Sequence, residues 1–380
     1  MEVLCLVKFI ITLMRFFLNI IYGLIKIVTR PHKKIIFLSR QSNGPSIDIT
    51  MLSDKIKQLH PEYEVVILCK KIGDGLSGKI SYCFHMLKQM YHLASCEVVI
   101  LDSYAILVSL LHHRSSLLVI QMWHSVGTMK KFAYSILDKP EGSSSIIANA
   151  MKMHHNYDYI LCAGEGYRDH LAEGFNYPTD KIKILPLPRV EVLQSEAYSN
   201  STKEIIYKIH PELKNKKNIL YVPTFRKDKE EGNKFIEAVD NLEKAFIPYS
   251  RQYNLIIKAH PLSGFDGGYE DFSSFNMLFI ADYVISDYSC IIYEAAIRHI
   301  PLFFYTYDYE SYMSKRDIYM DYKNELPNKM FDNPSDLLSA IDTNKFDMAN
   351  QDAFLSKYVK YKRPHITADI VDFIWEHKKA

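Results

Sequence analysis

A histidine stands where a run of apolar residues gives way to small and basic ones, in the stretch MWHSVGTMKK at residues 122–131. This residue is His124, and Gly127, Lys130 and Lys131 follow it. A neutral imidazole, with a pKa near ~6.5, can take a proton from an alcohol that attacks an electrophile. A lone histidine often does no more than end a strand, but its position at a predicted strand terminus favours a functional role. We therefore predict that His124 is a general base.

A second histidine and an arginine follow apolar runs in the second half of the chain. His260 comes after the run LIIKA, and in its protonated form it could stabilise charge on a phosphate or a leaving group. Pro261 follows it, so a simple strand end is the alternative. Arg226, in the stretch PTFR, is typical of an anion clamp, because a guanidinium can bind phosphate oxygens with two parallel hydrogen bonds. These two residues predict a site for a phosphorylated ligand.

Hydroxyl groups gather near the same strand ends, just before the helical stretch IIYEAAIRH. Free backbone N–H groups and the positive end of a helix dipole make such a place suited to a phosphate. The same side chains also cap helices, and the two roles are compatible. Glu294, inside this stretch, is either a surface carboxylate or an acceptor for a ribose hydroxyl. The residues that we expect to bind the ligand are Thr224, Arg226, Ser286, Asp287, Ser289 and Glu294.

The composition excludes several other classes of protein. The chain has 380 residues, and its 46 lysines and arginines nearly balance 44 aspartates and glutamates, so nucleic acid is not an expected partner. The six cysteines form no C-x-x-C pair, and neither D-x-D nor H-E-x-x-H occurs. We therefore expect no metal site and no cofactor, although Mg²⁺ held through water would leave no motif. No G-x-x-x-x-G-K-[ST] occurs, which argues against a standard P-loop site.

Two series of short, continuously apolar runs must position these side chains. Runs without polar alternation are typical of parallel strands covered on both faces, and helical stretches such as 78–95 separate them. Ligands bind beyond the carboxyl ends of such strands, where the candidate residues stand. The sequence therefore predicts an α/β protein with two doubly wound Rossmann-like domains that face each other across a cleft. The first series is KIIFLS, EVVILC, EVVILD, LLVIQMW, YDYILCA and KIKILPL, and the second is NILYVPT, YNLIIKA, ADYVIS and PLFFYTY.

The alternation of apolar runs and helical stretches breaks near residues 190–203, and we predict the boundary between the two domains there. One Rossmann-like domain is expected at 31–195 and the other at 203–365. Residues 366–380 are expected to form an amphipathic helix that packs on either domain. Residues 1–30 stand apart from both domains as a further helix.

Residues 1–28 form an apolar stretch that three cations interrupt. Lys8, Arg15 and Lys26 fall at nearly one azimuth of a helix, with Asn19 close beside them, so a narrow polar, basic stripe runs along an otherwise apolar surface. This pattern predicts an amphipathic helix that lies in a membrane interface, with its cations toward anionic headgroups. A tilted span, a signal anchor and a helix docked on protein are the alternatives. An exposed apolar helix also invites self-association, which leaves a homo-oligomer open.

Four motifs follow one another along the chain: QMWHSVGTMKKF at 121–132, YVPTFR at 221–226, KAHP at 258–261 and ISDYS at 285–289. Together they resemble the CDP-glycerol glycerophosphotransferase family of teichoic acid synthesis. A looser segment, RDIY at 316–319 followed by Leu-Pro, extends the likeness to most of the chain after about residue 100. Residues before that match only in general pattern. The sequence departs from the family pattern at Ser125, Glu294, Asp317 and Asn328, which leaves the polyol open between glycerol and ribitol.

The resemblance implies a glycosyltransferase-B fold and a peripheral protein on the cytoplasmic side of the cell membrane. It also implies transfer of a polyol phosphate from a CDP-polyol to a hydroxyl of a lipid-linked acceptor, with release of CMP, in the synthesis of teichoic acid or a related polymer. Residues 31–195 would be the acceptor domain and 203–365 the CDP-donor domain. His124 would be the base, His260 would stand beside the attacked phosphate, and Arg316 would join the donor-binding residues.

Two other functions stay open at this point. A glycosyltransferase of the same fold would move a sugar from a nucleotide-sugar and release a nucleoside diphosphate. A membrane-bound nucleotide-binding protein without turnover would bind the donor and form no product.

Overall fold

The computed structural model describes residues 2–260, 263–265 and 267–379, with only the backbone of residues 2–5. Contacts divide the chain into two units. The N-terminal unit comprises Met1–Ser125, Lys131–Arg189 and Lys362–Ala380, and the C-terminal unit comprises Val126–Lys130 and Val190–Tyr361. The sequence pattern indicated a boundary near 190–203, but it gave no sign that Val126–Lys130 belongs with the second half of the chain.

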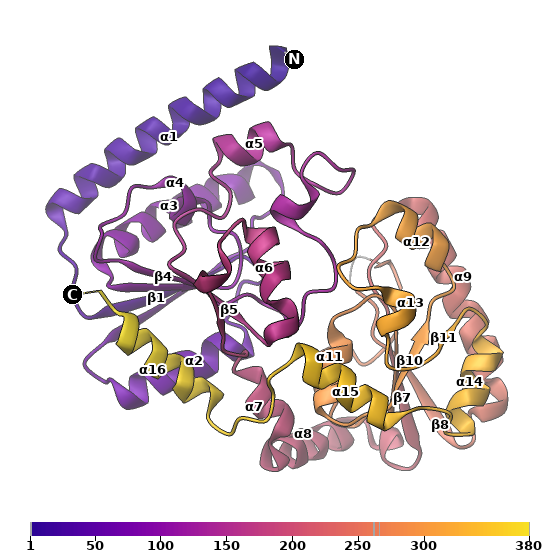
Figure 1. The fold of residues 1–380 in the computed structure, drawn as a ribbon. Helices are drawn as coiled ribbons and strands as arrows, with labels where there is room; N and C mark the ends of the chain where they lie inside the picture. The colour runs from indigo at the N-terminus through magenta and orange to yellow at the C-terminus, as the bar shows by residue number, and fades with distance from the viewer. Residues whose placement is uncertain (1, 261–262, 266, 380) are drawn as a thin grey trace. The chain divides into compact units, whose positions relative to one another are not determined.

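Six parallel strands form the sheet of the N-terminal unit, in the order β2-β1-β3-β4-β5-β6 (Figure 1). Strands β1, β3 and β4 are buried at every position, as expected for apolar runs that helices cover on both faces. The runs predicted as strands in this half are therefore confirmed. The strands are β1 (Lys34–Ser39), β2 (Glu64–Cys69), β3 (Val98–Leu101), β4 (Leu118–Gln121), β5 (Tyr159–Cys162) and β6 (Ile182–Ile184).

Helices flank this sheet, and the last helix of the chain is one of them. Helix α2 (Ile47–Leu59) begins after Ser46, whose hydroxyl accepts a hydrogen bond from the backbone N–H of Ile49. Helix α16 (Ile366–His377) packs against α2, where the Trp375 and His60 rings stack with centroids 3.5 Å apart. The C-terminal helix thus belongs to the N-terminal unit. The other helices of this unit are α3 (Gly75–Ser95), α4 (Ile106–Leu110), α5 (Ser145–Ala150) and α6 (Arg168–Phe175).

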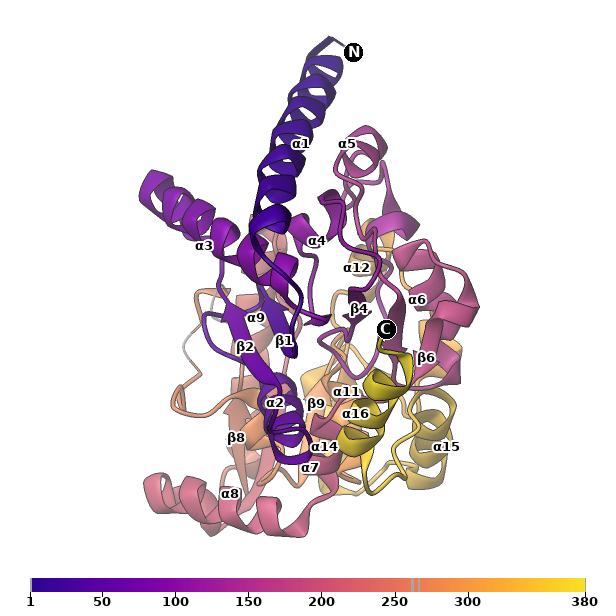
Figure 2. The same ribbon diagram turned by 90° about the vertical axis from the view of Figure 1, so that its left-hand side faces the viewer.

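The first helix, α1 (Glu2–Val28), lies beside α3 and α5 of the same unit (Figure 2). Part of its polar stripe contacts the protein. The Asn19 amide donates a hydrogen bond to the Leu110 carbonyl at 3.1 Å, and the Lys26 ammonium donates to the His112 carbonyl at 2.7 Å. The prediction that this stripe faces lipid headgroups therefore does not hold for its C-terminal half, because main-chain carbonyls already bind these donors.

The opposite surface of α1 is apolar and exposed. By length and composition, Leu6–Val28 is also able to cross a membrane. Helix α3 adds further exposed apolar side chains to the same unit. We call these two sets the apolar surface of α1 and α3. It comprises Leu6, Phe9, Ile10, Leu13, Met14, Phe16, Phe17, Ile20, Ile21, Leu24, Ile27 and Val28 on α1, and Leu76, Ile80, Phe84, Leu87 and Tyr91 on α3.

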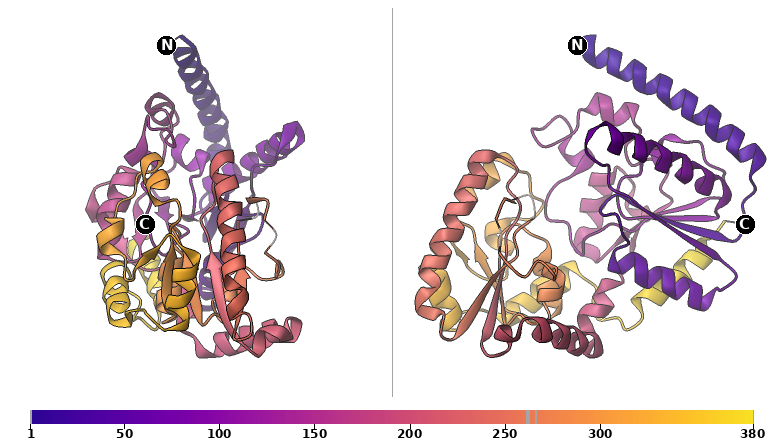
Figure 3. Two further views of the ribbon diagram at one scale, coloured as in Figure 1. Left: turned by 90° about the vertical axis from the view of Figure 1, so that its right-hand side faces the viewer. Right: turned by 180° about the vertical axis from the view of Figure 1, so that it is seen from behind.

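Five parallel strands form the sheet of the C-terminal unit, in the order β11-β10-β9-β7-β8. Figure 3 shows this sheet together with the helices of the unit. The four runs predicted in this half are strands, whereas β11, with two residues, was too short to detect. The strands are β7 (Lys217–Val222), β8 (Tyr253–Ile257), β9 (Tyr283–Ser286), β10 (Leu302–Tyr305) and β11 (Met330–Phe331). The helices of this part of the chain are α7 (Arg189–Gln194), α8 (Glu196–Ile209), α9 (Lys229–Phe246), α10 (Ser274–Met277), α11 (Ile291–Ile297), α12 (Tyr309–Lys315), α13 (Tyr322–Glu325), α14 (Pro334–Asp342) and α15 (Met348–Tyr358).

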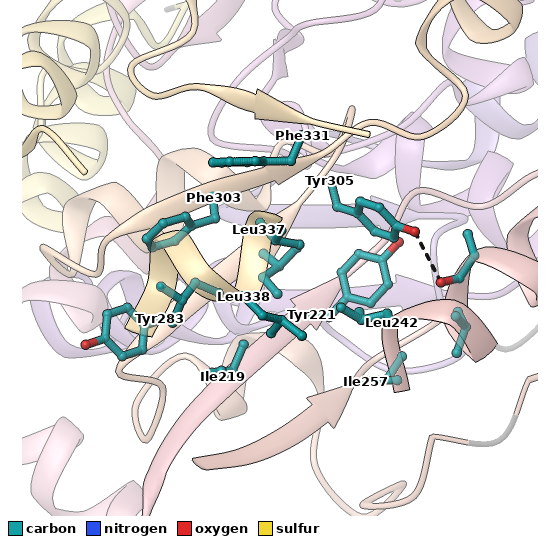
Figure 4. Packing of buried hydrophobic residues seen from close by; sticks show 14 of the residues in the cluster. Ile219, Tyr221, Leu242, Ile257, Tyr283, Phe303, Tyr305, Phe331, Leu337 and Leu338 are labelled. Carbon is teal, nitrogen blue, oxygen red and sulfur yellow. Dashed lines mark hydrogen bonds between the residues drawn. The ribbon is translucent and has the colours of Figure 1, made fainter. Parts of the chain in front are cut away.

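Helices α9 and α14 cover one face of this sheet, and aromatic side chains fill the space between them and the strands (Figure 4). Tyr221 and Tyr305 lie in this core with ring centroids 6.0 Å apart, and the Tyr305 hydroxyl donates a hydrogen bond to the Ala238 carbonyl. Leu242 of α9 and Leu337 of α14 are fully buried in the same cluster. This packing fixes the strand ends from which the candidate site residues project.

Both sheets share one strand order, because β7 to β11 repeat the arrangement of β1 to β5. In each sheet the chain first adds a strand on one side and then continues on the other side. Such a doubly wound sheet has a switch point, between β1 and β3 in one unit and between β7 and β9 in the other, and ligands bind at the carboxyl ends of the strands there. The predicted α/β class with two Rossmann-like units is confirmed.

Candidate active site

The residues after the strands at both switch points are polar. Arg40 and Asp102 follow β1 and β3 in the N-terminal unit, and His124 follows the neighbouring strand β4. In the C-terminal unit, Thr224 and Asp287 follow β7 and β9.

The imidazole of His124 is oriented by the strand next to its own. Its Nδ1 lies 3.0 Å from the main-chain carbonyl oxygen of Asp102. A carbonyl can only accept a hydrogen bond, so Nδ1 carries the proton and Nε2 of the neutral ring holds the lone pair. Burial lowers the pKa of His124, the Asp102 carbonyl opposes this shift, and the charge of Arg189 adds to it. The ring is thus kept neutral, with Nε2 as the basic atom.

The residue before this histidine has a strained backbone. Trp123 has φ 69°, a left-handed conformation that costs a bulky L-residue about 1–3 kcal/mol and is found most often at functional sites. The Gln121 side chain accepts a hydrogen bond from the Trp123 backbone N–H at 2.9 Å, and the Trp123 ring packs against Phe132 and Phe175. These contacts hold the turn that aims His124. Gln121 was not predicted as a site residue, although a polar side chain near the end of the apolar run LLVIQMW was the available signal.

The carboxyl of Asp102 is an unusual neighbour for this ring. Asp102 is 2% exposed, and its Oδ1 is buried with no hydrogen-bond partner among the described residues. Burial raises the pKa of Asp102 to about 6, and the hydroxyls of Ser39 and Ser103 offset part of the shift. Near neutral pH this group therefore lies close to its own titration range.

In the C-terminal unit, Arg226 joins two carboxylates. Its Nε donates to Asp308 at 2.7 Å, its Nη2 donates to both Asp308 and Asp287 at 3.1 and 3.0 Å, and its Nη1 donates to the Thr224 carbonyl at 2.7 Å. Arg226 and Asp287 are almost completely buried. Burial opposes the charge of Arg226, but Asp287 and Asp308 outweigh it and raise the pKa. In this structure the guanidinium binds the protein's own carboxylates, so its predicted role as an anion clamp stays a prediction.

Asp287 organises the loop around the end of β7. Its Oδ1 accepts hydrogen bonds from the backbone N–H groups of Thr224, at 2.8 Å, and Tyr288, at 2.6 Å. Its main-chain carbonyl accepts from the Tyr322 hydroxyl. Asp308, which follows β10, was missed by sequence reasoning, although a polar residue after the apolar run PLFFYTY was the available signal.

The predicted hydroxyls occupy different environments. Ser286 is fully buried, and its Oγ donates to the Val222 carbonyl of the neighbouring strand at 3.0 Å. Ser289 accepts a hydrogen bond from the backbone N–H of Ile291 at the start of α11. Thr224 has a buried Oγ1 that finds no hydrogen-bond partner in the part of the chain that the structure describes. Thr224 therefore offers a hydroxyl to a ligand, whereas Ser286 is engaged within the sheet.

The remaining predicted residues are His260, Glu294 and Arg316. His260 is exposed after β8, with its ring 4.9 Å from that of Phe225, and the adjacent Pro261 lies outside the described residues. Glu294 is buried on α11, so its reading as a surface carboxylate is wrong, and its ribose role stays a prediction. Arg316 forms two hydrogen bonds with Glu231, at 3.1 and 3.0 Å.

Among residues 2–260, 263–265 and 267–379, no group of three or more His, Cys, Asp or Glu side chains is placed to hold a metal ion. The expectation of a reaction without cofactor stays a prediction, because water-held Mg²⁺ needs no such group.

Comparison with known proteins decides the class of chemistry. The family model for CDP-glycerol:poly(glycerophosphate) glycerophosphotransferases matches residues 21–376. The chain belongs to this family. Its resemblance to these glycerophosphotransferases, first visible in four short motifs, thus extends over nearly the whole chain. The chain is an enzyme, a phosphotransferase of the CDP-glycerol type in teichoic acid synthesis, which removes the alternative of a protein without turnover.

Individual members of the glycerophosphotransferase family support this assignment. The teichoic acid ribitol-phosphate primase of Bacillus spizizenii is 28% identical over 354 residues, which cover 90% of this chain and 91% of that protein. The teichoic acid glycerol-phosphate primase of Bacillus subtilis is 26% identical over 300 residues, 76% of each chain. The structure of the wall teichoic acid polymerase TagF is similar with a TM-score of 0.71 and 20% identity, covering 98% of this chain and 97% of that one. This last likeness concerns the fold.

Proposed function

We propose that this family member moves a polyol phosphate from a CDP-polyol to a hydroxyl of a lipid-linked acceptor and releases CMP. The observation that supports this most directly is the ring of His124, whose Nδ1 is bound by the Asp102 carbonyl while Nε2 has no hydrogen-bond partner among the described residues. An imidazole held in this tautomer is suited to accept a proton at Nε2.

In this proposal the reaction begins with proton transfer to Nε2 of His124. Nε2 of His124 takes the proton from the acceptor hydroxyl, and the oxygen forms a bond to the phosphorus that carries the polyol. The bond from that phosphorus to the CMP oxygen breaks on the opposite side, and CMP leaves. Positioning and fixed positive charge supply most of the rate enhancement in such a transfer, because the transition state is crowded and anionic.

The C-terminal unit holds the donor in this proposal. Thr224 presents its Oγ1, which has no hydrogen-bond partner among the described residues, at the end of β7, and Ser289 stands at the start of α11. Arg226 acts indirectly, because it fixes Asp287 and the Thr224 carbonyl through four hydrogen bonds to three residues. His260, exposed after β8, stabilises charge on the attacked phosphate.

The apolar surface of α1 and α3 supports attachment to a membrane. A lipid-linked acceptor presents its hydroxyl close to the bilayer surface, so an enzyme that lies there meets its substrate in two dimensions. Exposed Phe9, Phe16 and Leu24 would enter the boundary between headgroups and acyl chains. We place the protein on the cytoplasmic side, as the resemblance to its family implies.

Ribitol phosphate is the second candidate for the transferred group, and addition of a single unit is the candidate mode of action. The ribitol-phosphate primase supports both points, and this chain matches it over 91% of that protein's length. Glycerol phosphate has the support of the family model and of the glycerol-phosphate primases.

Product analysis tests the proposal. The protein is reconstituted in lipid and given CDP-glycerol or CDP-ribitol with a prenyl-diphosphate-linked disaccharide. We expect the acceptor to gain the mass of one glycerol phosphate or one ribitol phosphate. Gain of a sugar from a nucleotide-sugar, with release of a nucleoside diphosphate, would replace the proposal with the glycosyltransferase alternative.

A further inference from the structure

The five residues Val126–Lys130, which we call the crossing segment, belong to the C-terminal unit although the chain on both sides belongs to the N-terminal unit. Its backbone is paired with the chain after α12. Lys130 forms an antiparallel bridge with Ile318, and the Tyr319 N–H donates a hydrogen bond to the Met129 carbonyl at 2.8 Å. Val126 and Met129 are each 1% exposed. The segment is therefore a fixed part of the C-terminal unit.

The side chain of Lys130 reaches a cluster of charges in this unit. Its ammonium lies 5.5 Å from the ring centroid of Tyr312, and the guanidinium carbons of Arg226 and Arg316 lie 4.8 and 4.4 Å from the same centroid. Tyr312 itself stacks on Tyr288, with ring centroids 3.7 Å apart. Three cations thus surround one aromatic ring next to Asp287.

Carboxylates of the protein pair with two of these cations. Arg226 is paired with Asp287 and Asp308, and Arg316 with Glu231. Among the described residues, Lys130 has no hydrogen-bond or ion-pair partner for its ammonium.

Lys315 also binds Glu231, at 3.2 Å. Asp287, the carboxylate whose charge acts on Lys130, is already paired with Arg226. A mostly buried cation without a counter-ion is unfavourable unless a ligand supplies the negative charge. The members of the cluster are Lys130, Arg226, Lys315, Arg316, Asp287, Asp308 and Glu231.

The charged groups near Lys130 indicate which part of a ligand its ammonium would bind. Burial lowers the pKa of Lys130, the nearby Asp287 and Cys290 raise it, and Arg226 and Arg316 lower it. Asp287 and Cys290 stand at the end of β9 and the start of α11, beside Ser289. The ammonium is thus near the strand end at the switch point of the C-terminal unit, where the proposed donor would place its phosphates.

We infer that Lys130 binds the diphosphate of the donor and supplies the positive charge that compensates it as the phosphorus is attacked. This inference rests on the proposed function, since it names a further donor-binding residue. A lysine ammonium acts as a compact point charge on a phosphate, whereas the arginines of the cluster are held by their carboxylates.

Calorimetric titration of the full-length protein tests the inference. CDP-glycerol, CMP and cytidine are titrated into the wild type and into Lys130→Met, with cytidine measured by competition. We expect Lys130→Met to weaken CDP-glycerol binding at least tenfold, CMP binding less, and cytidine binding less than twofold. Lys130→Arg should restore most of the CDP-glycerol affinity. Lys323→Met is the matched control, because Lys323 is an exposed lysine of the same unit whose ammonium pairs with exposed Glu310 and lies over the Tyr309 ring.

The outcomes separate the inference from the proposed function. Unchanged CDP-glycerol affinity in Lys130→Met, or equal loss for cytidine and CDP-glycerol, would overturn the role of Lys130 and leave the proposed function intact. If the wild type binds no cytidine compound, the proposed function fails. Pyrophosphate binding then decides the inference: loss of affinity in Lys130→Met supports a phosphate site, and no loss overturns it. Unchanged thermal unfolding of Lys130→Met would show that the variant is folded.

Discussion

The Nδ1 atom of His124 donates a hydrogen bond to the main-chain carbonyl of Asp102, at 3.0 Å. This contact joins the ends of β4 and β3, two neighbouring strands of the N-terminal unit. Because the acceptor is a backbone atom, it neither changes charge nor depends on the side chain at position 102. The tautomer of His124 is therefore set by the fold, and Nε2 is the atom left for proton transfer.

The pH dependence of turnover should report the titration of His124. Burial and Arg189 lower its pKa below ~6.5, and the Asp102 carbonyl opposes the shift only in part. Since the neutral ring is the base, kcat should be constant at neutral pH and fall on acidification, with a midpoint below pH ~6.5. The measurement is the rate of CMP release between about pH 5 and 8.

The pKa of Asp102 is raised to about 6, so this carboxyl also takes up a proton on acidification, and Asp102→Asn is the control for the profile. The variant keeps the backbone carbonyl and should keep the acidic fall in kcat. Disappearance of the fall in Asp102→Asn would assign it to the carboxyl and contradict the role of His124.

Asp102→Asn should also change the pH dependence of folding stability. The pKa of Asp102 is raised from 3.8 to about 6 in the folded protein, so its contribution to stability is fully present below pH 3.8 and is lost as pH rises through 6. Above pH 6 the charged, buried carboxylate costs roughly 2–3 kcal/mol, which the amide avoids. Urea unfolding at several pH values should show the variant gaining stability relative to the wild type between about pH 4 and 6. A difference that does not vary with pH would refute the assignment.

The ion pairs of Arg226 should contribute mainly to the free energy of unfolding. Arg226→Met removes the partner of Asp287 and Asp308, and breaking a buried pair of this kind typically costs about 3–5 kcal/mol of unfolding free energy. Lys323→Met, which breaks an exposed pair with Glu310, should cost less than about 1 kcal/mol. Urea unfolding measures the loss of unfolding free energy in both variants. A loss of donor affinity in Arg226→Met without any loss of stability would instead support the original prediction of an anion clamp.

The apolar surface of α1 and α3 should bind membranes. The double variant Phe9→Ser and Phe16→Ser removes two side chains that are 65% and 60% exposed, and it should reduce cosedimentation with anionic lipid vesicles at least tenfold. Ile247→Ser is the matched control, since Ile247 is 68% exposed but lies in the C-terminal unit. Equal reduction by the control would show that the binding is not specific to α1.

The two sheets were predictable from the sequence because their strands are unbroken apolar runs, such as KIIFLS for β1 and LFFY within β10. The positions of His124, Thr224 and Asp287 followed, since each comes directly after such a run. The groups that these side chains contact were harder to predict. The atom that holds His124 is a backbone carbonyl, which has no side-chain signal, and the pairs of Arg226 with Asp308 and of Arg316 with Glu231 join residues far apart in sequence.

Two further features could not be read from local pattern. The polar stripe of α1 predicted a lipid-facing surface, but Asn19 donates to the carbonyl of Leu110 at the end of α4, and Lys26 donates to the carbonyl of His112 just after it. An amphipathic pattern gives the azimuth of the polar face, and it does not say whether water, lipid or protein lies against it. The crossing segment likewise depends on one antiparallel bridge between Lys130 and Ile318, which no periodicity indicates.

The role of His124 is best measured by CMP release from a CDP-polyol in the presence and absence of the lipid-linked acceptor, with wild type and His124→Ala in parallel. We expect acceptor-dependent CMP release by the wild type and a fall in kcat of roughly 10²- to 10⁴-fold in the variant, without loss of CDP-polyol binding. Turnover by His124→Ala within a few-fold of the wild type would contradict the assignment of the base, and the absence of CMP release with both CDP-glycerol and CDP-ribitol would contradict the proposed reaction.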